Sequence, residues 1–354
     1  MEFSYKFPAI KGIQANQEYY TIMVPLKLLS KIFIFNEDME DIPAEFRAQR
    51  NLNLSRIPAM GDYILNNINT YVFSSLTASI DGHMKFESNN GKDIGYLHID
   101  MESKFLINDG QHRKAAIDYA LSRSEELKNE TISIVLYKDK DLKRSQQMFS
   151  DLNRHAITPT RSIGILYDSR DEIAKITKEL ISELDIFRLY TDKEKSSLAK
   201  FSPKAFTLST VYSANKKIIA NKDINKEFLI KFWTAIFENI EEFKMLKNKE
   251  ISPSALRMSY VITHGTFLEA IGIIGNYYYE SDWKECNSKL KKLNKISWNR
   301  ENKEWSKRIV AENGRIVKNI KAIKLTASLI KTKIEIPLTT EECKLEKEYF
   351  NNGK

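Results

Sequence analysis

The chain has 354 residues, a formal net charge of +8 at pH 7 and a pI near 9.1. Its length favours two domains, or one domain with a large helical extension, and its basic balance favours an acidic partner such as nucleic acid. Its two cysteines, Cys286 and Cys343, lie far apart, which argues against a disulfide scaffold or a cysteine zinc site and predicts a cytoplasmic protein. We expect no signal peptide, and no membrane span at residues 260–279, because that apolar stretch contains His264, Glu269 and three glycines.

Residues 1–165 are predicted to form a mixed α/β domain. Runs of β-branched and aromatic residues with turn signals between them predict strands at 19–24, 71–80, 94–99, 105–107 and 131–137. Helical spacing of apolar residues predicts helices at 58–66, at 142–152 and from the segment 111–115 onwards. Residues 26–34 fit either a short helix or a continuation of the first strand, and residues 156–161 are expected to be a loop.

Residues 166–354 are predicted to form an all-α domain. No glycine occurs between residues 165 and 264, and long helical patterns dominate, with a broad apolar face over residues 228–240. The fold class is therefore α+β, with a mixed α/β domain at 1–165 followed by a helical, basic domain at 166–354.

Positive charge is concentrated in residues 284–333, which hold 15 Lys and Arg residues against 4 Asp and Glu residues, a net charge of +11. Trp283, Trp298 and Trp305 lie in or beside this window. Cations that meet phosphates and flat rings that stack are what a nucleic-acid surface needs. The alternative is a solvated helix face with the tryptophans in the core. The predicted DNA contacts are six cations of the window: Lys291, Lys292, Arg300, Lys303, Lys307 and Arg308.

The stretch 105–119 places five polar residues where a strand ends and a helix begins. The first turn of a helix has unpaired N–H groups and the positive end of the helix dipole, and Gly110 lets an anion approach the backbone. In one interpretation Arg113 binds a nucleotide or DNA phosphate, and Asp109 caps the helix or holds a metal. In a second, His112 is a general acid or base in phosphoryl chemistry. In a third, Asp109 is only the N-cap, His112 is half-buried and Arg113 pairs with a carboxylate.

Two further segments extend the predicted phosphate site. Asn153 and Arg154 close a helix and either complete the pocket or form a plain C-cap. Residues 47–56 carry three arginines with no acid between them, which either grip phosphates or lie on an exposed surface. The predicted phosphate-binding residues are Arg47, Arg50, Arg56, Gly110, Gln111, Arg113, Asn153 and Arg154. If the protein is an enzyme, the predicted catalytic residues are Asp109, His112 and Arg113.

Several familiar sites are absent from the sequence. The five histidines have no metal-ligand spacing, so no protein metal site is expected. The chain has no GxxxxGK[ST] loop, which excludes an ordinary P-loop NTPase, and no GxSxG or GxGxxG motif. No segment is a convincing helix-turn-helix.

The residues 109–113 read Asp-Gly-Gln-His-Arg, and on this motif the chain resembles the DGQHR-motif proteins, specifically the DndB family encoded with bacterial DNA phosphorothioate modification genes. The resemblance covers most of the chain. The N-terminal part also resembles, more distantly, the ParB/sulfiredoxin fold, in which a strand-to-helix turn and a later helix ending in Asn-Arg bind nucleotide phosphates. The segments that carry the resemblance to the DndB family are residues 47–56, 80–82, 108–113, 145–155, 166–170 and 206–212.

The family resemblance implies a protein that binds double-stranded promoter DNA and negatively regulates its modification genes. In this interpretation the basic window 284–333 binds the promoter DNA, and the DGQHR domain senses a nucleotide or modified DNA. The fold resemblance implies an alternative, in which the DGQHR site and Asn153 hydrolyse ATP or another NTP, or nick DNA, with Mg²⁺ neutralising charge. Other proteins of the modification system are further expected partners. A repressor of a palindromic site is expected to be a homodimer, although no coiled-coil seam predicts one.

Overall fold

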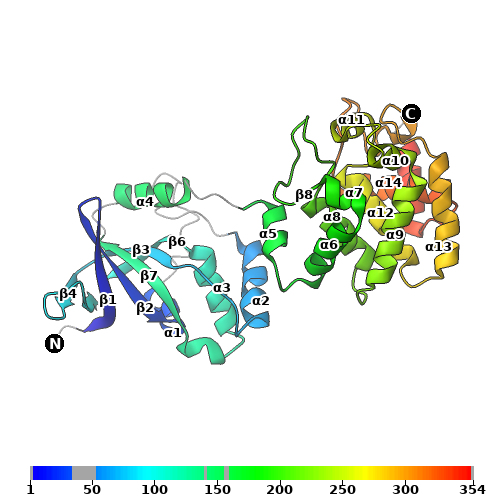
Figure 1. Ribbon diagram of the computed structural model, residues 1–354. Helices are drawn as coiled ribbons and strands as arrows, with labels where there is room; N and C mark the ends of the chain where they lie inside the picture. Colours follow the sequence, from blue (N-terminus) through cyan, green and yellow to red (C-terminus); the bar gives the residue numbers. More distant parts are fainter. Residues whose placement is uncertain (1–2, 34–52, 139–141, 155–158, 352–354) are drawn as a thin grey trace. The chain divides into compact units, whose positions relative to one another are not determined.

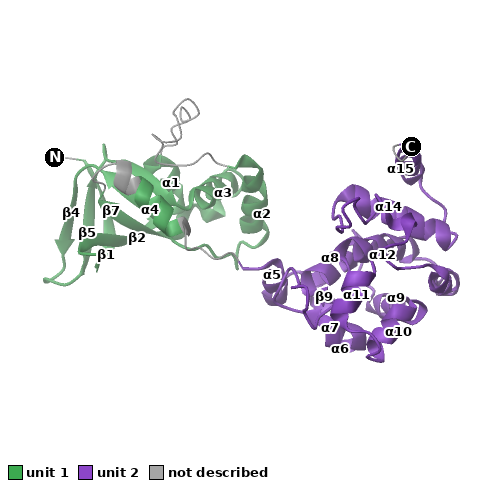
Figure 2. Cartoon of the chain, turned by 90° about the horizontal axis from the view of Figure 1, so that it is seen from above, with its two compact units in different colours: residues 1–157 green, residues 158–354 purple. Residues whose placement is uncertain are grey.

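The computed structural model describes residues 3–33, 53–138, 142–154 and 159–351, and the chain divides into two compact units, residues 1–157 and 158–354 (Figures 1 and 2). Unit 1 consists of a sheet and helices, and unit 2 is almost entirely helical. This confirms the predicted α+β fold class.

The boundary between the units comes before the expected position at residue 165. Helix α5 (Arg161–Tyr167) belongs to unit 2, where the buried Ser162 hydroxyl donates to the carbonyl oxygen of Lys195 at 2.7 Å. The glycine-free segment that begins after Gly164 therefore starts a few residues later in the sequence than the boundary itself. Of the loop expected at 156–161, residues 156–158 lie outside the described residues, and Arg161 already belongs to α5.

Unit 1 is built on a seven-stranded sheet in the order β4-β5-β1-β2-β7-β3-β6, in which β3 and β7 are parallel and the other neighbours are antiparallel. Its strands are β1 (Ser4–Gln14), β2 (Gln17–Pro25), β3 (Leu76–Asp81), β4 (Met84–Ser88), β5 (Ile94–Asp100), β6 (Lys104–Asp109) and β7 (Thr131–Lys138). Its helices are α1 (Leu26–Ile32), the 3-10 turn η3 (Leu54–Arg56), α2 (Ile57–Asn66), α3 (Gln111–Leu121), the 3-10 turn η4 (Glu126–Asn129) and α4 (Leu142–Arg154).

The elements of unit 1 agree with the predicted ones in most places. Residues 26–32 form a helix, which decides between the two alternatives for that segment. The strand expected at 71–80 was wrong for residues 71–75, because β3 begins only at Leu76. Strands β1 and β4 were not predicted; β1 joins β2 through a two-residue turn at Ala15 and Asn16, whose positive φ angles suit a type I′ hairpin.

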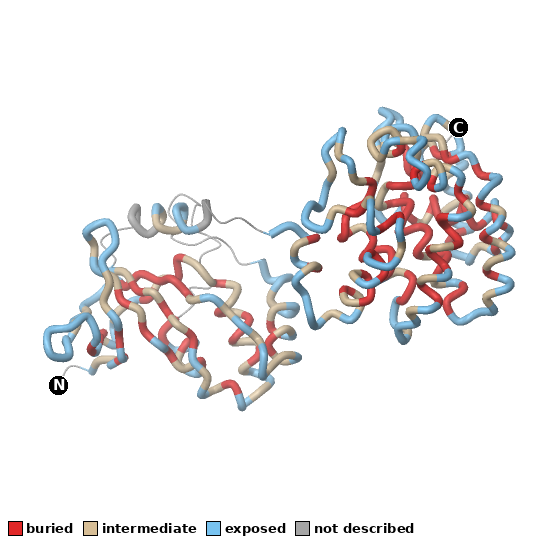
Figure 3. Tube along the Cα trace, in the orientation of Figure 1, coloured by how far each residue is buried: buried red, intermediate tan, exposed pale blue. Residues whose placement is uncertain are grey.

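The hydrophobic core of unit 1 is formed by buried side chains of the sheet and of helices α1 and α3 (Figure 3). From α3, Ala116, Ile117 and Ala120 face this core. Burial of this face fixes α3 against the sheet, so its first turn is held directly after β6.

Unit 2 is helical apart from a two-residue parallel ladder between β8 (Thr191–Asp192) and β9 (Phe206–Thr207). After α5 its helices are α6 (Glu172–Glu183), α7 (Asp185–Tyr190), α8 (Leu208–Ile219), α9 (Lys226–Asn239), α10 (Glu241–Lys247), α11 (Pro253–Ser259), α12 (Gly265–Tyr278), α13 (Trp283–Leu290), α14 (Ile320–Lys333) and α15 (Thr340–Asn351). The 3-10 turns η5 (Lys291–Lys295) and η6 (Lys303–Trp305) lie between α13 and α14. Among the described residues, no helix combines the length and the apolar character that a membrane crossing requires.

Helices α8 and α12 pack closely in the core of unit 2. A Cβ atom at Gly272 of α12 would lie 2.7 Å from the carbonyl oxygen of Ala214 of α8, so this contact requires glycine. On α8, the buried Asn215 side chain accepts a hydrogen bond from the indole N–H of Trp233 at 2.8 Å and donates one to the Thr177 hydroxyl at 2.9 Å. Satisfied buried polar groups of this kind fix one arrangement of the helices.

His264, at the start of α12, is desolvated and its Nε2–H donates to the carbonyl oxygen of Arg257 at 3.0 Å. Desolvation lowers the pKa of His264 to about 4, and the charges of Arg300 and Arg257 act in the same direction. Between about pH 6.5 and pH 4 the unfolded chain therefore binds a proton that the folded chain does not.

We expect the free energy of unfolding to fall as the pH decreases through this window, by up to about 3 kcal/mol from His264 alone. Urea unfolding of the wild type and of His264→Gln, measured at several pH values in the window, checks this. The variant should lose less stability than the wild type, and equal losses would contradict the prediction.

Candidate functional site

The turn between β6 and α3 requires glycine at position 110. Gly110 is the N-cap residue of α3 and has φ +104° and ψ 16°. A Cβ atom there would lie 2.4 Å from Cδ2 of Leu76 and 2.9 Å from Nη2 of Arg113. The predicted N-cap role of Asp109 is therefore wrong, since Asp109 is the last residue of β6 and the cap position belongs to Gly110.

The guanidinium group of Arg113 lies against this turn and is held by two acceptors. Its Nη2 donates to Oδ2 of Asp109 at 2.5 Å and to the carbonyl oxygen of Ser75 at 3.2 Å. Its Nε is buried and has no hydrogen-bond partner within the described part of the chain. Arg113 is thus fixed in place by a carboxylate, as in the third interpretation, while one of its donors is left unused.

His112 is half-buried, and its Nε2 accepts a hydrogen bond from the backbone N–H of Asn53 at 3.1 Å. This contact joins α3 to the segment that leads into η3. An imidazole nitrogen that accepts this bond must give it up before it takes a proton, which weakens the case for His112 as a general base.

A cavity of about 190 Å³ lies at the start of α3. Gln111, which is 7% exposed, lines it, and its Nε2 makes no hydrogen bond within the described residues. The cavity is smaller than the roughly 300–1,000 Å³ of most small-molecule pockets, so it suits one phosphate group better than a whole nucleotide. Its lining residues are Arg56, Met60, Asn108, Asp109, Gly110, Gln111, His112, Arg113 and Phe149.

The structure brings together Arg56 and the residues of the DGQHR motif, as the sequence predicted. Arg47 and Arg50 lie outside the described residues. Asn153 and Arg154 end helix α4, and their side chains lie outside the described part of the structure, so their role stays a prediction.

Four residues of this site were not found from the sequence. Met60 and Phe149 line the cavity, the carbonyl of Ser75 holds Arg113, and the backbone of Asn53 holds His112. Ser75 and Asn53 act through backbone groups, which no side-chain pattern in a sequence can reveal. Met60 and Phe149 are apolar, so the sequence does not distinguish them from ordinary core residues.

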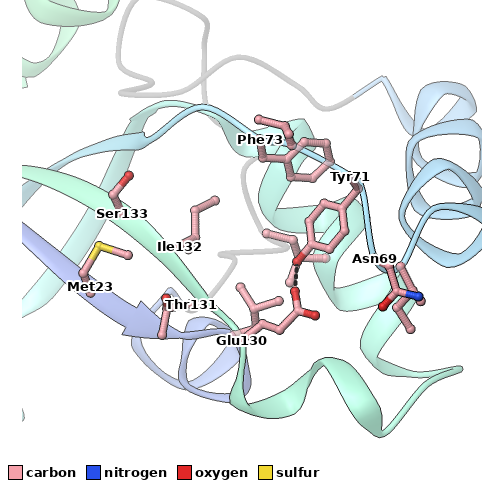
Figure 4. A pocket seen from close by; sticks show the side chains of 12 residues that line it. Met23, Asn69, Tyr71, Phe73, Glu130, Thr131, Ile132 and Ser133 are labelled. Carbon is pink, nitrogen blue, oxygen red and sulfur yellow. Dashed lines mark hydrogen bonds between the residues drawn. The ribbon is translucent and has the colours of Figure 1, made fainter. Parts of the chain in front are cut away.

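A second cavity of about 590 Å³ lies in unit 1 (Figure 4). The Tyr71 hydroxyl donates to the Glu130 carboxylate at its edge, and burial together with this acceptor raises the pKa of Tyr71. The hydroxyls of Ser133, which lines this cavity, and Ser75 are 2.6 Å apart. Since the Ser75 carbonyl accepts from Arg113, the segment 71–75 forms part of both surroundings, although the sequence predicted it as strand.

Arg308 is not available to DNA as the sequence predicted. It is 4% exposed, and both of its terminal nitrogens donate to the Glu346 carboxylate, with Nη2 at 2.6 Å from Oε2. Its Nη1 also donates to the carbonyl oxygen of Leu325 at 3.1 Å. This arginine therefore ties the segment that follows η6 to α14 and α15.

Trp298 and Trp305 are core residues and not stacking surfaces, so the alternative interpretation of these residues is the correct one. Each is 1% exposed, and their rings stack on each other with centroids 5.5 Å apart. Trp283 is partly buried and packs against the same core.

The other predicted DNA contacts lie at or near the surface and differ in whether they are already paired. Lys291 and Lys303 are exposed and form no ion pair within the described residues. Lys292 pairs with Glu335, and Lys307 pairs with Glu312 at 3.1 Å. Arg300 is half-buried and donates to the carbonyl oxygens of Met258 and Gly314.

The net charge of residues 284–333 overstates the positive surface. Within the described residues, eight of its fifteen cations form ion pairs, five of them with acids that follow the window at 335–346 and one with Glu269 of α12. In the described ranges, no three His, Cys, Asp or Glu side chains gather closely enough to hold a metal ion.

The comparison with protein families connects the chain to a biological system. The family model for DndB, described as DNA-sulfur modification-associated, matches residues 7–337. The chain belongs to the DndB family. Membership confirms the family that the DGQHR motif and the other segments indicated, and DndB proteins are associated with DNA sulfur modification. No curated protein and no solved structure matches the chain, so the ParB/sulfiredoxin resemblance stays a prediction.

Proposed function

We propose that this DndB-family protein is a cytoplasmic DNA-binding repressor of DNA phosphorothioate modification genes, in which the DGQHR turn holds a phosphate group. The cavity at the start of α3 carries the proposal, because Gln111 and Arg113 line it and each has a buried nitrogen, Nε2 of Gln111 and Nε of Arg113, without a hydrogen-bond partner in the described residues. The phosphate belongs to a nucleotide or to DNA. Promoter DNA, a second copy of the chain and other modification proteins are its proposed partners.

The physics of the turn supports an anion there. The first turn of α3 directs backbone N–H groups and the positive end of its dipole towards the cavity. Arg56 and Arg113 add positive charge, while Asp109 offsets part of it. A phosphate that binds here competes with the Asp109 carboxylate for Arg113, so the ion pair regulates access to the arginine.

The DNA surface that we propose consists of the exposed cations around η5 and η6, among them Lys291, Lys303 and Lys307. Lys292 and Arg300 lie at its edge. Repression then depends on phosphate contacts by these lysines, whose strength falls as salt rises.

Changing Lys291, Lys303 and Lys307 together to glutamine is expected to weaken binding to promoter DNA. The slope of log affinity against log salt should decrease by about 1 for each lost phosphate contact. Fluorescence anisotropy at several salt concentrations measures this. The control changes three lysines elsewhere in unit 2 whose side chains are 44–48% exposed, Lys175, Lys231 and Lys244, and should keep the wild-type slope. An unchanged slope in the first variant would rule out this surface.

A second candidate function is hydrolysis of ATP or another NTP, or nicking of DNA, by Asp109, His112, Arg113 and Asn153. The observation that favours it is that the Asp109 carboxylate lines the cavity and is 41% exposed, so it can join a Mg²⁺ ion carried by phosphates. The engaged Nε2 of His112 makes binding the better supported function.

A further inference from the structure

Unit 2 contains a cleft of about 720 Å³ that belongs to neither the DGQHR turn nor the proposed DNA surface. Its lining comes from α5, α8, α12, α14 and the beginning of α15. Three contacts show which end of the cleft lies near which part of α12. Glu269, in the first half of α12, meets Lys217 of α8 and Lys318 just before α14, whereas Tyr277, two turns later, lies 5.9 Å from Nζ of Lys331.

The end of the cleft near the first half of α12 is cationic. Arg161 and Lys216 are exposed and form no ion pair within the described residues. The Arg161 guanidinium lies 5.9 Å from the ring centroid of Tyr212, one turn before Lys216 on α8, so both cations are on the same side of the cleft. Lys217 shares the Glu269 carboxylate with a second lysine, so this end has a net positive charge.

The other end of the cleft is aromatic and has no net charge. The Tyr277 side chain is 44% exposed, and the neighbouring Asn276 amide donates to the carbonyl oxygen of Ile218 at 2.8 Å. The charged groups here neutralise each other: buried Lys331 and buried Glu342 are 2.6 Å apart, and the Glu342 carboxylate also accepts the Thr339 N–H. This end therefore offers a flat aromatic ring and, beside it, the carbonyl oxygen of the Asn276 side chain, whose N–H is already donated to Ile218.

We propose that this cleft binds a nucleotide, with its phosphates at Arg161 and Lys216 and its base against Tyr277. The two ends match the two halves of such a ligand, and the volume lies within the roughly 300–1,000 Å³ of small-molecule pockets. A nucleic-acid strand would place phosphates along the whole cleft, where the cations at the second end are already paired. Aromatic rings stack on any base, so the cleft does not by itself select one.

Isothermal titration of the full-length protein with ATP, inorganic triphosphate and a short single-stranded oligonucleotide tests the proposal. ATP should bind more tightly than triphosphate. Arg161→Gln with Lys216→Gln should weaken ATP binding at least about tenfold, as loss of two charge-assisted contacts predicts. Tyr277→Ala should weaken ATP binding by about tenfold but leave triphosphate binding unchanged, and Tyr277→Phe should keep the wild-type affinity. Lys231→Gln on α9 is the matched charge control and should change nothing.

The proposal is overturned by any of four results. The first is that the wild-type protein does not bind ATP. Equal affinities for ATP and triphosphate, with no effect of Tyr277→Ala, would make the cleft a simple anion site. An oligonucleotide that binds while ATP does not would make it a strand-binding groove. If Arg113→Gln abolished ATP binding and the cleft variants did not, the nucleotide would belong to unit 1. All altered side chains of the cleft are at least partly exposed, and thermal unfolding verifies that the variants fold.

Discussion

Replacing Arg308 with alanine is expected to lower the free energy of unfolding by about 3 kcal/mol, because it leaves the Glu346 carboxylate, whose side chain is only 14% exposed, without its partner. Arg308 holds Glu346 through two hydrogen bonds and lies 3.9 Å above the ring centroid of Tyr349. The same change removes the donor to the Leu325 carbonyl. Helix α15 should therefore detach more readily than the rest of unit 2.

Urea unfolding of Arg308→Ala beside Lys307→Ala measures this difference. Lys307 is the preceding residue and is exposed, so its loss should change stability by only about 0.5 kcal/mol or less. The double variant Arg308→Met with Glu346→Leu should recover much of the lost stability, because apolar side chains of similar size replace both charges. Wild-type stability of Arg308→Ala, together with weaker DNA binding, would show instead that this arginine contacts phosphates.

Arg308 shows why the basic window was read too simply from the sequence. A count of charges along the chain does not include partners that the fold brings in from elsewhere, and Glu346 comes from a helix 38 residues away. The prediction that the tryptophans form a stacking surface was wrong for a similar reason. Trp298 and Trp305 follow a spacing that fits either a surface or a core, and only the packing against Phe267 and against each other decides it.

The strands of unit 1 were predictable where the local pattern was strong. Strand β7 has buried side chains at alternate positions, Ile132, Ile134 and Leu136, and its apolar run shows this in the sequence. Strand β1 lies in the middle of the sheet but contains Pro8, opposite Tyr96. A proline usually argues against a central strand, so the tertiary pairing overrides the local signal there.

The turn at the start of α3 was placed correctly, but the role of one side chain in it was not. Asp is a favoured N-cap residue, which supported that role for Asp109. The left-handed conformation of Gly110 moves the cap one position along the chain, and Asp109 then lies four residues before Arg113 with its carboxylate on the guanidinium. The backbone conformation at Gly110 therefore determines that Asp109 pairs with Arg113, and the sequence indicates this conformation only through the glycine.

This ion pair leads to the second prediction, in which Asp109→Asn separates binding from catalysis. As a neutral amide, residue 109 no longer competes with an incoming anion for Arg113, and one negative charge leaves the cavity. The affinity for inorganic phosphate, measured by phosphorus NMR titration, should rise about tenfold, the equivalent of one charge-assisted hydrogen bond. If the site hydrolyses a nucleotide with Asp109 as a catalytic group, the same change should abolish phosphate release from ATP.

Two further variants make this result specific to the turn. Asp118→Asn removes a carboxylate of α3 that pairs with Lys114 at 2.6 Å and does not line the cavity, and it should leave phosphate affinity unchanged. Gly110→Ala places a methyl group between Leu76 and the guanidinium and should reduce phosphate binding even though no charge changes. Lower phosphate affinity in Asp109→Asn would show that the carboxylate positions Arg113 for the anion. Higher affinity, together with loss in Gly110→Ala, would show that Asp109 occupies the place of the phosphate until a ligand arrives.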